Sequence, residues 1–298
     1  MSSRTLQAYL ELTLAMIIAG SSVVAGKIVT GSFPVFLASG LRFALASALL
    51  VPLLYWREGG LPRLDRQDLC ILFLQSFAGA FLFNVFLLYG LRFTTAAESG
   101  IITATTPAVI GILSSLFLKE RVAWNRCAGI VLSGLGILAV GVGSTLSSPG
   151  NGPNPLLGDI LVFGAVIGEA LFTVLGKAES QKVSPLALSA LMSLIAFVLS
   201  LPLSLYEAAT FDFSRVPLRG WLLIVYYGVV VTAVSFPLWY GGVAKVPAST
   251  SGVFTGVLPV SAVILSYAVL HEPFLWSHFA GVLCVLVGIA FIAREGEG

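Results

Sequence analysis

Ten apolar runs of roughly 20 residues make up most of this sequence, and they limit the possible folds more than any other feature. Roughly 20 helical residues cross a hydrocarbon core about 30 Å thick. The runs are too long for the strands of a membrane barrel, and they lack its two-residue alternation. We therefore predict an all-α integral membrane protein. Its ten transmembrane helices are expected over residues 8–29, 33–56, 68–91, 95–118, 125–145, 156–177, 184–206, 217–242, 248–270 and 275–293.

The composition agrees with a chain that lipid surrounds. Of the 298 residues, 57% are hydrophobic and 10% are charged, whereas soluble domains carry roughly 25% charged residues. The net charge of +2, without a basic stripe, argues against a nucleic-acid partner. The three cysteines, Cys70, Cys127 and Cys284, show neither CxxC spacing nor a His at ligand spacing. We therefore predict no disulfide, no bound metal and no cofactor.

The distribution of Lys and Arg predicts the orientation, because positively charged loops stay in the cytoplasm. With the N-terminus inside, eleven of these residues fall on the inner side and four on the outer side, while Arg42 lies within the second span. The sequence therefore predicts that both the N-terminus and the C-terminus are cytoplasmic.

The sequence repeats itself at an offset of 152 residues. Of the 42 positions from 99 to 140, 14 are identical to their counterparts, and the matches include Pro107 with Pro259. Each half holds five spans, an odd number, so corresponding helices must cross the membrane in opposite directions. We predict a first five-helix repeat over residues 1–145, an external linker over 146–155, and a second, inverted repeat over 156–298.

This repeat design also indicates a function. Transporters built from inverted repeats bind their substrate near the membrane midplane, where the two halves meet. The sequence has no Walker loop and no GxSxG motif, and no nucleophile and base are visible at membrane depth. We therefore predict a secondary transporter rather than an enzyme or an ATP-driven pump. A non-transporting intramembrane binding protein is the alternative from another class.

Glu169 is the first candidate for substrate binding. It lies about thirteen residues into the sixth predicted span, near the midplane. A carboxylate at that depth costs several kcal/mol unless it faces water, a partner or a proton. We predict that Glu169 lines a cavity and either attracts a substrate ammonium group or carries a proton. The alternatives are a structural ion pair with Lys27 or Arg42, or a permanently protonated side chain.

The order of these features resembles the EamA type of the drug/metabolite transporter (DMT) superfamily, and within it bacterial exporters of aromatic and neutral amino acids. The resemblance covers the whole chain. It rests on Gly20 to Lys27 closing the first span, on Arg42, and on a twice-repeated order of small residues, mid-helix Pro, terminal Glu and Gly-containing last helix at 97–137 and 249–289. Similar proteins often carry an aromatic or small residue near Glu169. The substrate preference of those proteins therefore carries over less directly to this chain.

The resemblance implies a five-plus-five inverted fold with a central cavity lined by spans one, three, four, six, eight and nine. It also implies export of amino acids and related metabolites by alternating access, from a multi-pass position in the bacterial inner (plasma) membrane. The expected partners are a small-molecule substrate and the lipid bilayer, and a monomer is one option for the oligomeric state. An exporter of cationic or aromatic drugs is the alternative, and a nucleotide-sugar carrier ranks below it.

Polar and aromatic side chains on the spans assigned to the cavity are candidates for substrate contact. An aromatic wall with a few hydrogen-bonding groups suits apolar amino acids. The small, hydroxyl-rich starts of spans four and nine offer helix N-terminal dipoles to a substrate carboxylate, with close helix packing as the alternative. The predicted cavity residues are Ser21, Asn84, Ser99, Thr103, Glu169, Ser235, Trp239, Tyr240, Ser251 and Thr255.

Four further charged residues are predicted to act in gating or in structure. Lys27 and Lys177 end corresponding helices, where they can snorkel towards the headgroups or contact the substrate. Arg42 is expected in a structural ion pair or against backbone carbonyls, because the resemblance places it on a peripheral helix. Glu98 is a second candidate proton carrier beside Glu169.

Two prolines are predicted hinges. Pro107 and Pro259 occupy corresponding positions within helices, and each removes a backbone hydrogen bond. A static kink is the alternative at both positions.

Overall fold

The computed structural model describes residues 3–106, 108–110, 112–113, 131–132, 135, 154–179, 182–246, 254–272, 276, 279–280, 282–284 and 287. All regular secondary structure in these residues is helical. Most residues of the predicted spans 125–145 and 275–293 lie outside the described residues, as does most of the predicted linker. Pro107 and Ser251 also lie outside them, and so does the side chain of Lys177.

Within the described part of the chain, six helical segments are long and apolar enough to cross a membrane. This confirms the prediction of an all-helical, multi-pass membrane protein. The segments coincide with six of the predicted spans, apart from a few residues at their ends. They run from Thr5 to Val29, Val35 to Glu58, Arg66 to Phe93, Pro155 to Leu175, Pro185 to Thr210 and Leu218 to Val243.

Four of these six segments are continuous α-helices. They are α1 (Ser3–Val29), α2 (Val35–Glu58), α8 (Pro155–Glu179) and α9 (Pro185–Thr210). Helix α9 begins where the Ser184 side chain accepts a hydrogen bond from the Ala187 amide, and Pro185 follows at the first helical position. A side-chain cap followed by proline is a strong signal for a helix start, because the cap oxygen accepts from an amide that has no helical partner, and proline has no N–H that would need one.

The other two spanning segments contain a π-helical stretch at their middle. One consists of α3 (Arg66–Ser76), η1 (Phe77–Leu82) and α4 (Phe83–Phe93). The second consists of α10 (Leu218–Tyr226), η3 (Tyr227–Val234) and α11 (Ser235–Val243), and a short 3-10 turn, η2 (Phe213–Arg215), precedes it. Such π-helical turns are uncommon and often occur at functional sites.

Two shorter helices complete the described fold. Helix α5 (Ala96–Thr103) begins with a capping box, in which Thr95 and Glu98 exchange hydrogen bonds with each other's backbone amides. Helix α13 (Val257–Leu270) is apolar and contains Pro259. They fall within the fourth and ninth predicted spans.

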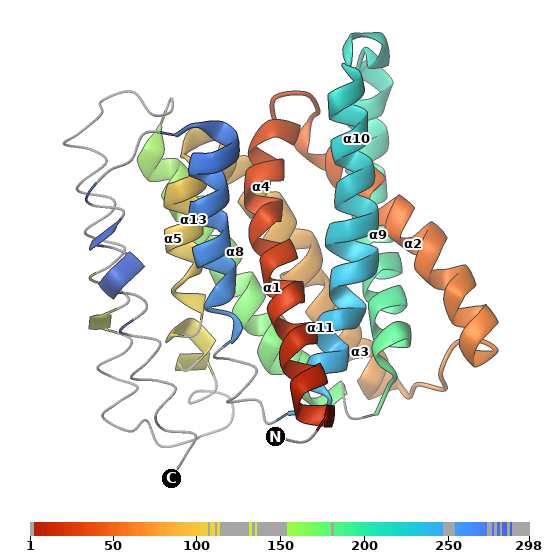
Figure 1. The fold of residues 1–298 in the computed structure, drawn as a ribbon. Helices are drawn as coiled ribbons and strands as arrows, with labels where there is room; N and C mark the ends of the chain where they lie inside the picture. Colours follow the sequence, from red (N-terminus) through yellow and green to blue (C-terminus); the bar gives the residue numbers. More distant parts are fainter. Residues whose placement is uncertain are drawn as a thin grey trace.

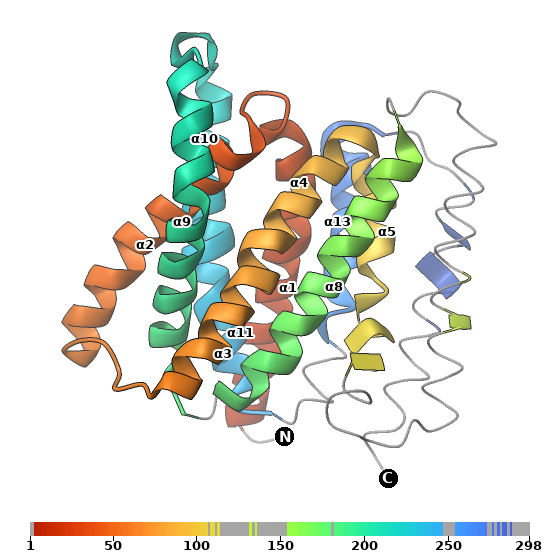
Figure 2. The same ribbon diagram turned by 180° about the vertical axis from the view of Figure 1, so that it is seen from behind.

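The helices pack as a bundle in which early and late parts of the chain alternate (Figure 1). Helix α1 contacts α11 and α13, α2 contacts α9, and α4 contacts α8. Helix α1 rises from the N-terminus, whereas α8 descends beside α4, as the opposite view in Figure 2 also shows. This interleaving brings side chains from both halves of the sequence to the middle of the bundle.

Candidate substrate cavity

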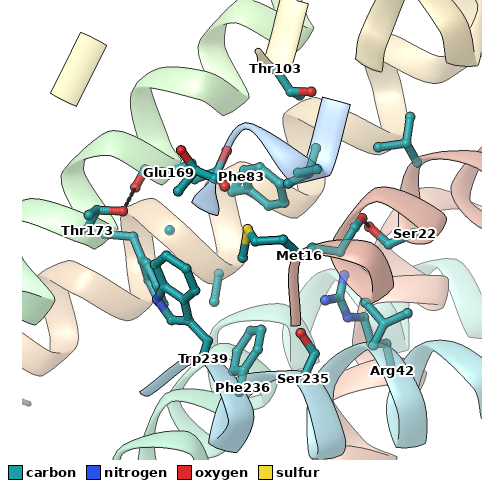
Figure 3. A pocket seen from close by; sticks show the side chains of 18 of the residues that line it. Met16, Ser22, Arg42, Phe83, Thr103, Glu169, Thr173, Ser235, Phe236 and Trp239 are labelled. Atoms are coloured by element: carbon teal, nitrogen blue, oxygen red, sulfur yellow. Dashed lines mark hydrogen bonds between the residues drawn. The ribbon is translucent and has the colours of Figure 1, made fainter. Parts of the chain in front are cut away.

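A cavity of about 90 Å³ lies inside the bundle, which is room for several water molecules. Figure 3 shows the side chains that line it. Both π-helical stretches reach its wall, through Gly79 and Ala80 of η1 and Val231 of η3. The wall is mostly apolar and aromatic, with a few polar groups. The lining residues are Met16, Ala19, Ser22, Val23, Arg42, Phe43, Gly79, Ala80, Phe83, Thr103, Glu169, Phe172, Thr173, Val231, Ser235, Phe236, Trp239, Thr255 and Leu258.

Glu169 borders this cavity from α8. The Thr106 hydroxyl donates a hydrogen bond to its Oε2 at 3.0 Å. The Thr173 hydroxyl, one turn later, donates to the backbone carbonyl of Glu169 at 3.0 Å. Among the described residues, Glu169 forms no ion pair with Lys27 or Arg42, the structural partners considered from the sequence. The carboxylate is therefore available to a group inside the cavity.

Arg42 also borders the cavity, from α2. Its Nε donates to Thr232 Oγ1 at 2.8 Å, and its Nη1 donates to Asn84 Oδ1 at 2.6 Å. The rings of Phe43 and Tyr227 lie 5.1 and 4.8 Å from its Cζ, within range of a cation–π interaction. These partners differ from the carboxylate or backbone carbonyls expected from the sequence. They hold the guanidinium in place without neutralising its charge.

The structure brings five of the ten predicted cavity residues together on the cavity wall, from α5, α8, α11 and the turn before α13. These residues are Thr103, Glu169, Ser235, Trp239 and Thr255.

The remaining described candidates lie beside the cavity rather than on its wall. Asn84 bonds to Arg42 and to Ser39, at 2.6 and 2.5 Å. Ser21 and the Tyr226 hydroxyl are 2.5 Å apart, and Ser99 donates to the Thr95 carbonyl at 2.8 Å. Tyr240 accepts a hydrogen bond from the Gln75 side chain at 3.0 Å. Asn84 thus acts on the cavity through Arg42. The contacts of Ser21 and Tyr240 join neighbouring helices, whereas that of Ser99 stays within the first turns of α5.

Most of the aromatic wall was not predicted from the sequence, namely Phe43, Phe83, Phe172 and Phe236. For Phe172 a signal existed, because it lies three residues after Glu169 and therefore on the same helix face. No such pattern singles out Phe43 or Phe83. Their positions depend on how α2 and the π-helical stretch before α4 pack.

A second polar cluster lies where α1 ends. Lys27 Nζ donates to the carbonyl of Leu91 at 2.5 Å and to that of Thr94. The Thr94 hydroxyl lies 2.6 Å from Glu98 Oε2 and 2.8 Å from Asp159 Oδ1. This cluster joins α1, α4, α5 and α8.

Glu272 extends this cluster from the end of α13. Its two carboxylate oxygens accept hydrogen bonds from the amides of Ala96 and Ala97, each at 2.9 Å. These amides belong to the first turn of α5, where backbone N–H groups lack helical partners and negative charge is favoured. The contact therefore ties the end of α13 to the start of α5.

We expect Thr94→Val to destabilise the protein by about 1–3 kcal/mol, because a fully buried hydroxyl that contacts two carboxylates is lost while the side-chain shape is kept. The thermal midpoint of purified protein measures this effect. Thr210→Val is the matched control, since the Thr210 hydroxyl is exposed and donates only to the nearby Glu207 carbonyl. Equal midpoints for the two variants would contradict the expectation.

Comparison with known proteins identifies the family of this chain. The sequence profile of the EamA-like transporter family matches residues 6–142 and, a second time, residues 156–294. The chain belongs to the EamA-like transporter family. The resemblance to the EamA type is thereby confirmed. The family is one of transporters rather than of catalysts. Its members act in a lipid bilayer on small-molecule substrates.

Alignments with relatives in the family cover nearly the whole chain. The uncharacterized transporter YetK of Bacillus subtilis (strain 168) is 49% identical over 282 residues, which cover 95% of this chain and 85% of the relative. The uncharacterized transporter YyaM of the same organism is 26% identical over 95% of this chain and 92% of the relative. A crystal structure with 19% identity superposes with a TM-score of 0.67, over 100% of this chain and 99% of that one, and supports the fold.

Residues from both matched segments line the cavity. Its lining residues from Met16 to Thr103 fall in the first matched segment, and those from Glu169 to Leu258 fall in the second. The cavity therefore lies between the two copies of the family's sequence pattern.

Proposed function

We propose that this EamA-like transporter is a secondary transporter that exports amino acids and related small metabolites across the bacterial inner membrane by alternating access. The observation that carries the proposal is the cavity between the two matched segments, where the Glu169 carboxylate faces an apolar, aromatic space. A substrate ammonium group would bind Glu169, and an apolar side chain would pack against the rings. Both termini are proposed to be cytoplasmic.

The helix contacts support the inverted five-plus-five arrangement proposed here, with repeats over residues 1–145 and 156–298 and a linker between them. Several contacts between helices recur when each helix is exchanged for its counterpart. Helix α1 packs on α11 as α8 packs on α4, and α1 packs on α13 as α8 packs on α5. Likewise α2 contacts η3, and α9 contacts η1. Rocking of two such halves would expose the cavity to each side in turn.

Export of cationic or aromatic drugs is the second candidate function. A carboxylate surrounded by aromatic rings also suits a bulky organic cation, as Glu169 with Phe172 and Trp239 could provide. Arg42 lines the same cavity and opposes this function, because a cation without a carboxylate would face the uncompensated positive charge of Arg42. We therefore rank amino acids first.

Uptake into proteoliposomes tests the proposal directly. We expect purified protein to transport at least one of labelled threonine, methionine and phenylalanine, with a rate that saturates and that excess unlabelled amino acid suppresses. Protein-free liposomes set the background. No uptake of any of the three by folded protein would reject the amino-acid proposal. Uptake of an aromatic organic cation in the same vesicles would then support the drug-exporter function.

A further inference from the structure

We infer that Arg42 is the receptor for the substrate carboxylate, so that the cavity selects solutes that carry both a carboxylate and an ammonium group. This inference rests on the proposed transport function and assigns a ligand chemistry to one wall of the same cavity. It also changes the role of Arg42 from the structural one expected from the sequence to direct substrate contact.

Arg42 carries a positive charge that its hydrogen-bond partners do not compensate. The residue is only 5% exposed, and its hydrogen-bond partners Asn84 and Thr232 are neutral. Ion pairs in the described part of the chain join other residues, among them Lys182 with Asp68, Arg215 with Asp212 and Lys245 with Glu11. A buried charge without a counter-ion is unfavourable, so an anion that enters the cavity would gain strongly from meeting it.

The geometry of the Arg42 guanidinium also suits a carboxylate. The two hydrogen bonds to Thr232 and Asn84 use two of its five N–H groups. Its guanidinium points towards the cavity in Figure 3, near Ser22 and Ser235. A planar guanidinium with free N–H groups matches the two oxygens of a carboxylate. The neutral partners hold this receptor in position before the substrate arrives.

The same cavity also contains a group of opposite charge, the Glu169 carboxylate. Glu169 lies on the other side of Met16 from Arg42 in Figure 3, and its side-chain hydrogen-bond partner is the neutral Thr106. The two charges are therefore held apart instead of neutralising each other. An amino-acid zwitterion can satisfy both of them. An amine without a carboxylate leaves Arg42 uncompensated, and an acid without an amine leaves Glu169 uncompensated.

Competition in proteoliposomes of the unmodified protein tests this inference without any variant. For whichever labelled amino acid is taken up best, the competitors are the unlabelled amino acid, the amine that lacks its carboxylate and the acid that lacks its amine. For phenylalanine these are phenylalanine, 2-phenylethylamine and 3-phenylpropionate. We expect both truncated compounds to compete roughly ten- to hundredfold more weakly than the amino acid.

Asn84→Asp provides a variant of nearly unchanged shape. It would place a carboxylate against Arg42 Nη1, where the amide oxygen now lies at 2.6 Å. This internal counter-ion would compete with the substrate carboxylate. We expect the preference for the amino acid over the matching amine to fall about tenfold or more. Arg92→Gln is the control, because Arg92 lies at the end of α4, outside the cavity wall, and we expect its preference to stay unchanged.

The outcomes separate this inference from the proposed function. Saturable uptake with equal competition by the amino acid and its amine, and with the same preference in Asn84→Asp, would overturn the role of Arg42 and leave amino-acid transport standing. Absence of uptake for threonine, methionine and phenylalanine alike would overturn both proposals. Weak competition by both truncated compounds would support the inference even if Asn84→Asp did not fold.

Discussion

Glu169→Gln is expected to reduce amino-acid uptake by more than tenfold. Glutamine keeps the size of the side chain and can still accept the hydrogen bond from Thr106, but it removes the negative charge from the cavity. A substrate ammonium group would lose a charge-assisted hydrogen bond, which contributes about 1.5–3 kcal/mol. Initial rates of labelled amino-acid uptake in proteoliposomes, measured over a range of substrate concentrations, give the size of the effect.

The matched control is Glu58→Gln, which removes a carboxylate at the end of α2. Both carboxylate oxygens of Glu58 lie 2.8 Å from the Ser184 hydroxyl, at an exposed position away from the cavity wall. We expect this variant to transport at close to the unmodified rate. Unchanged uptake by Glu169→Gln at every pH tested would remove Glu169 from the proposed binding site and would weaken the amino-acid proposal.

The spanning helices were predictable because the bilayer itself sets their length. Residues 8–29 and 33–56 were predicted from apolar run length alone, and the structure has spans at Thr5–Val29 and Val35–Glu58. The π-helical stretches Phe77–Leu82 and Tyr227–Val234 were not predictable in this way. Their sequences are as apolar as the α-helices beside them, and a change of backbone hydrogen-bonding register depends on packing with neighbouring helices.

Arg42 and Glu169 show where prediction of the site reached its limit. The cost of a charge inside the membrane marked both residues as needing a partner or a water-filled space. That cost did not indicate whether each residue has a partner or faces a water-filled space, because the direction of the side chain depends on the rotation of its helix. In the structure both face the cavity, and Arg42 finds neutral partners on α4 and η3. Ser235 and Trp239 lie four residues apart on one helix face, so a correct position for one implied the other.

Gly20→Ala is expected to lower the stability of the protein by about 1–3 kcal/mol or more, because α13 packs directly against α1 there. A Cβ atom at Gly20 would lie 2.5 Å from the Leu258 carbonyl oxygen and 3.1 Å from the Ala262 amide nitrogen, besides meeting the Ser261 side chain. Backbone atoms cannot rotate away as a side chain can, so the two helices would have to separate.

The consequence for function follows from the position of this contact. Leu258 of α13 and Ala19 of α1 both line the cavity, so separating the two helices would widen the cavity at this wall. We expect Gly20→Ala to lower the thermal midpoint and also to weaken substrate affinity, whereas Thr94→Val, away from the cavity, lowers the midpoint alone. Gly31→Ala is the control, because its added Cβ meets its nearest neighbour at 3.4 Å, an ordinary contact. Equal midpoints for Gly20→Ala and Gly31→Ala would show that α1 and α13 can move apart freely, as rocking of the two halves at this contact would require.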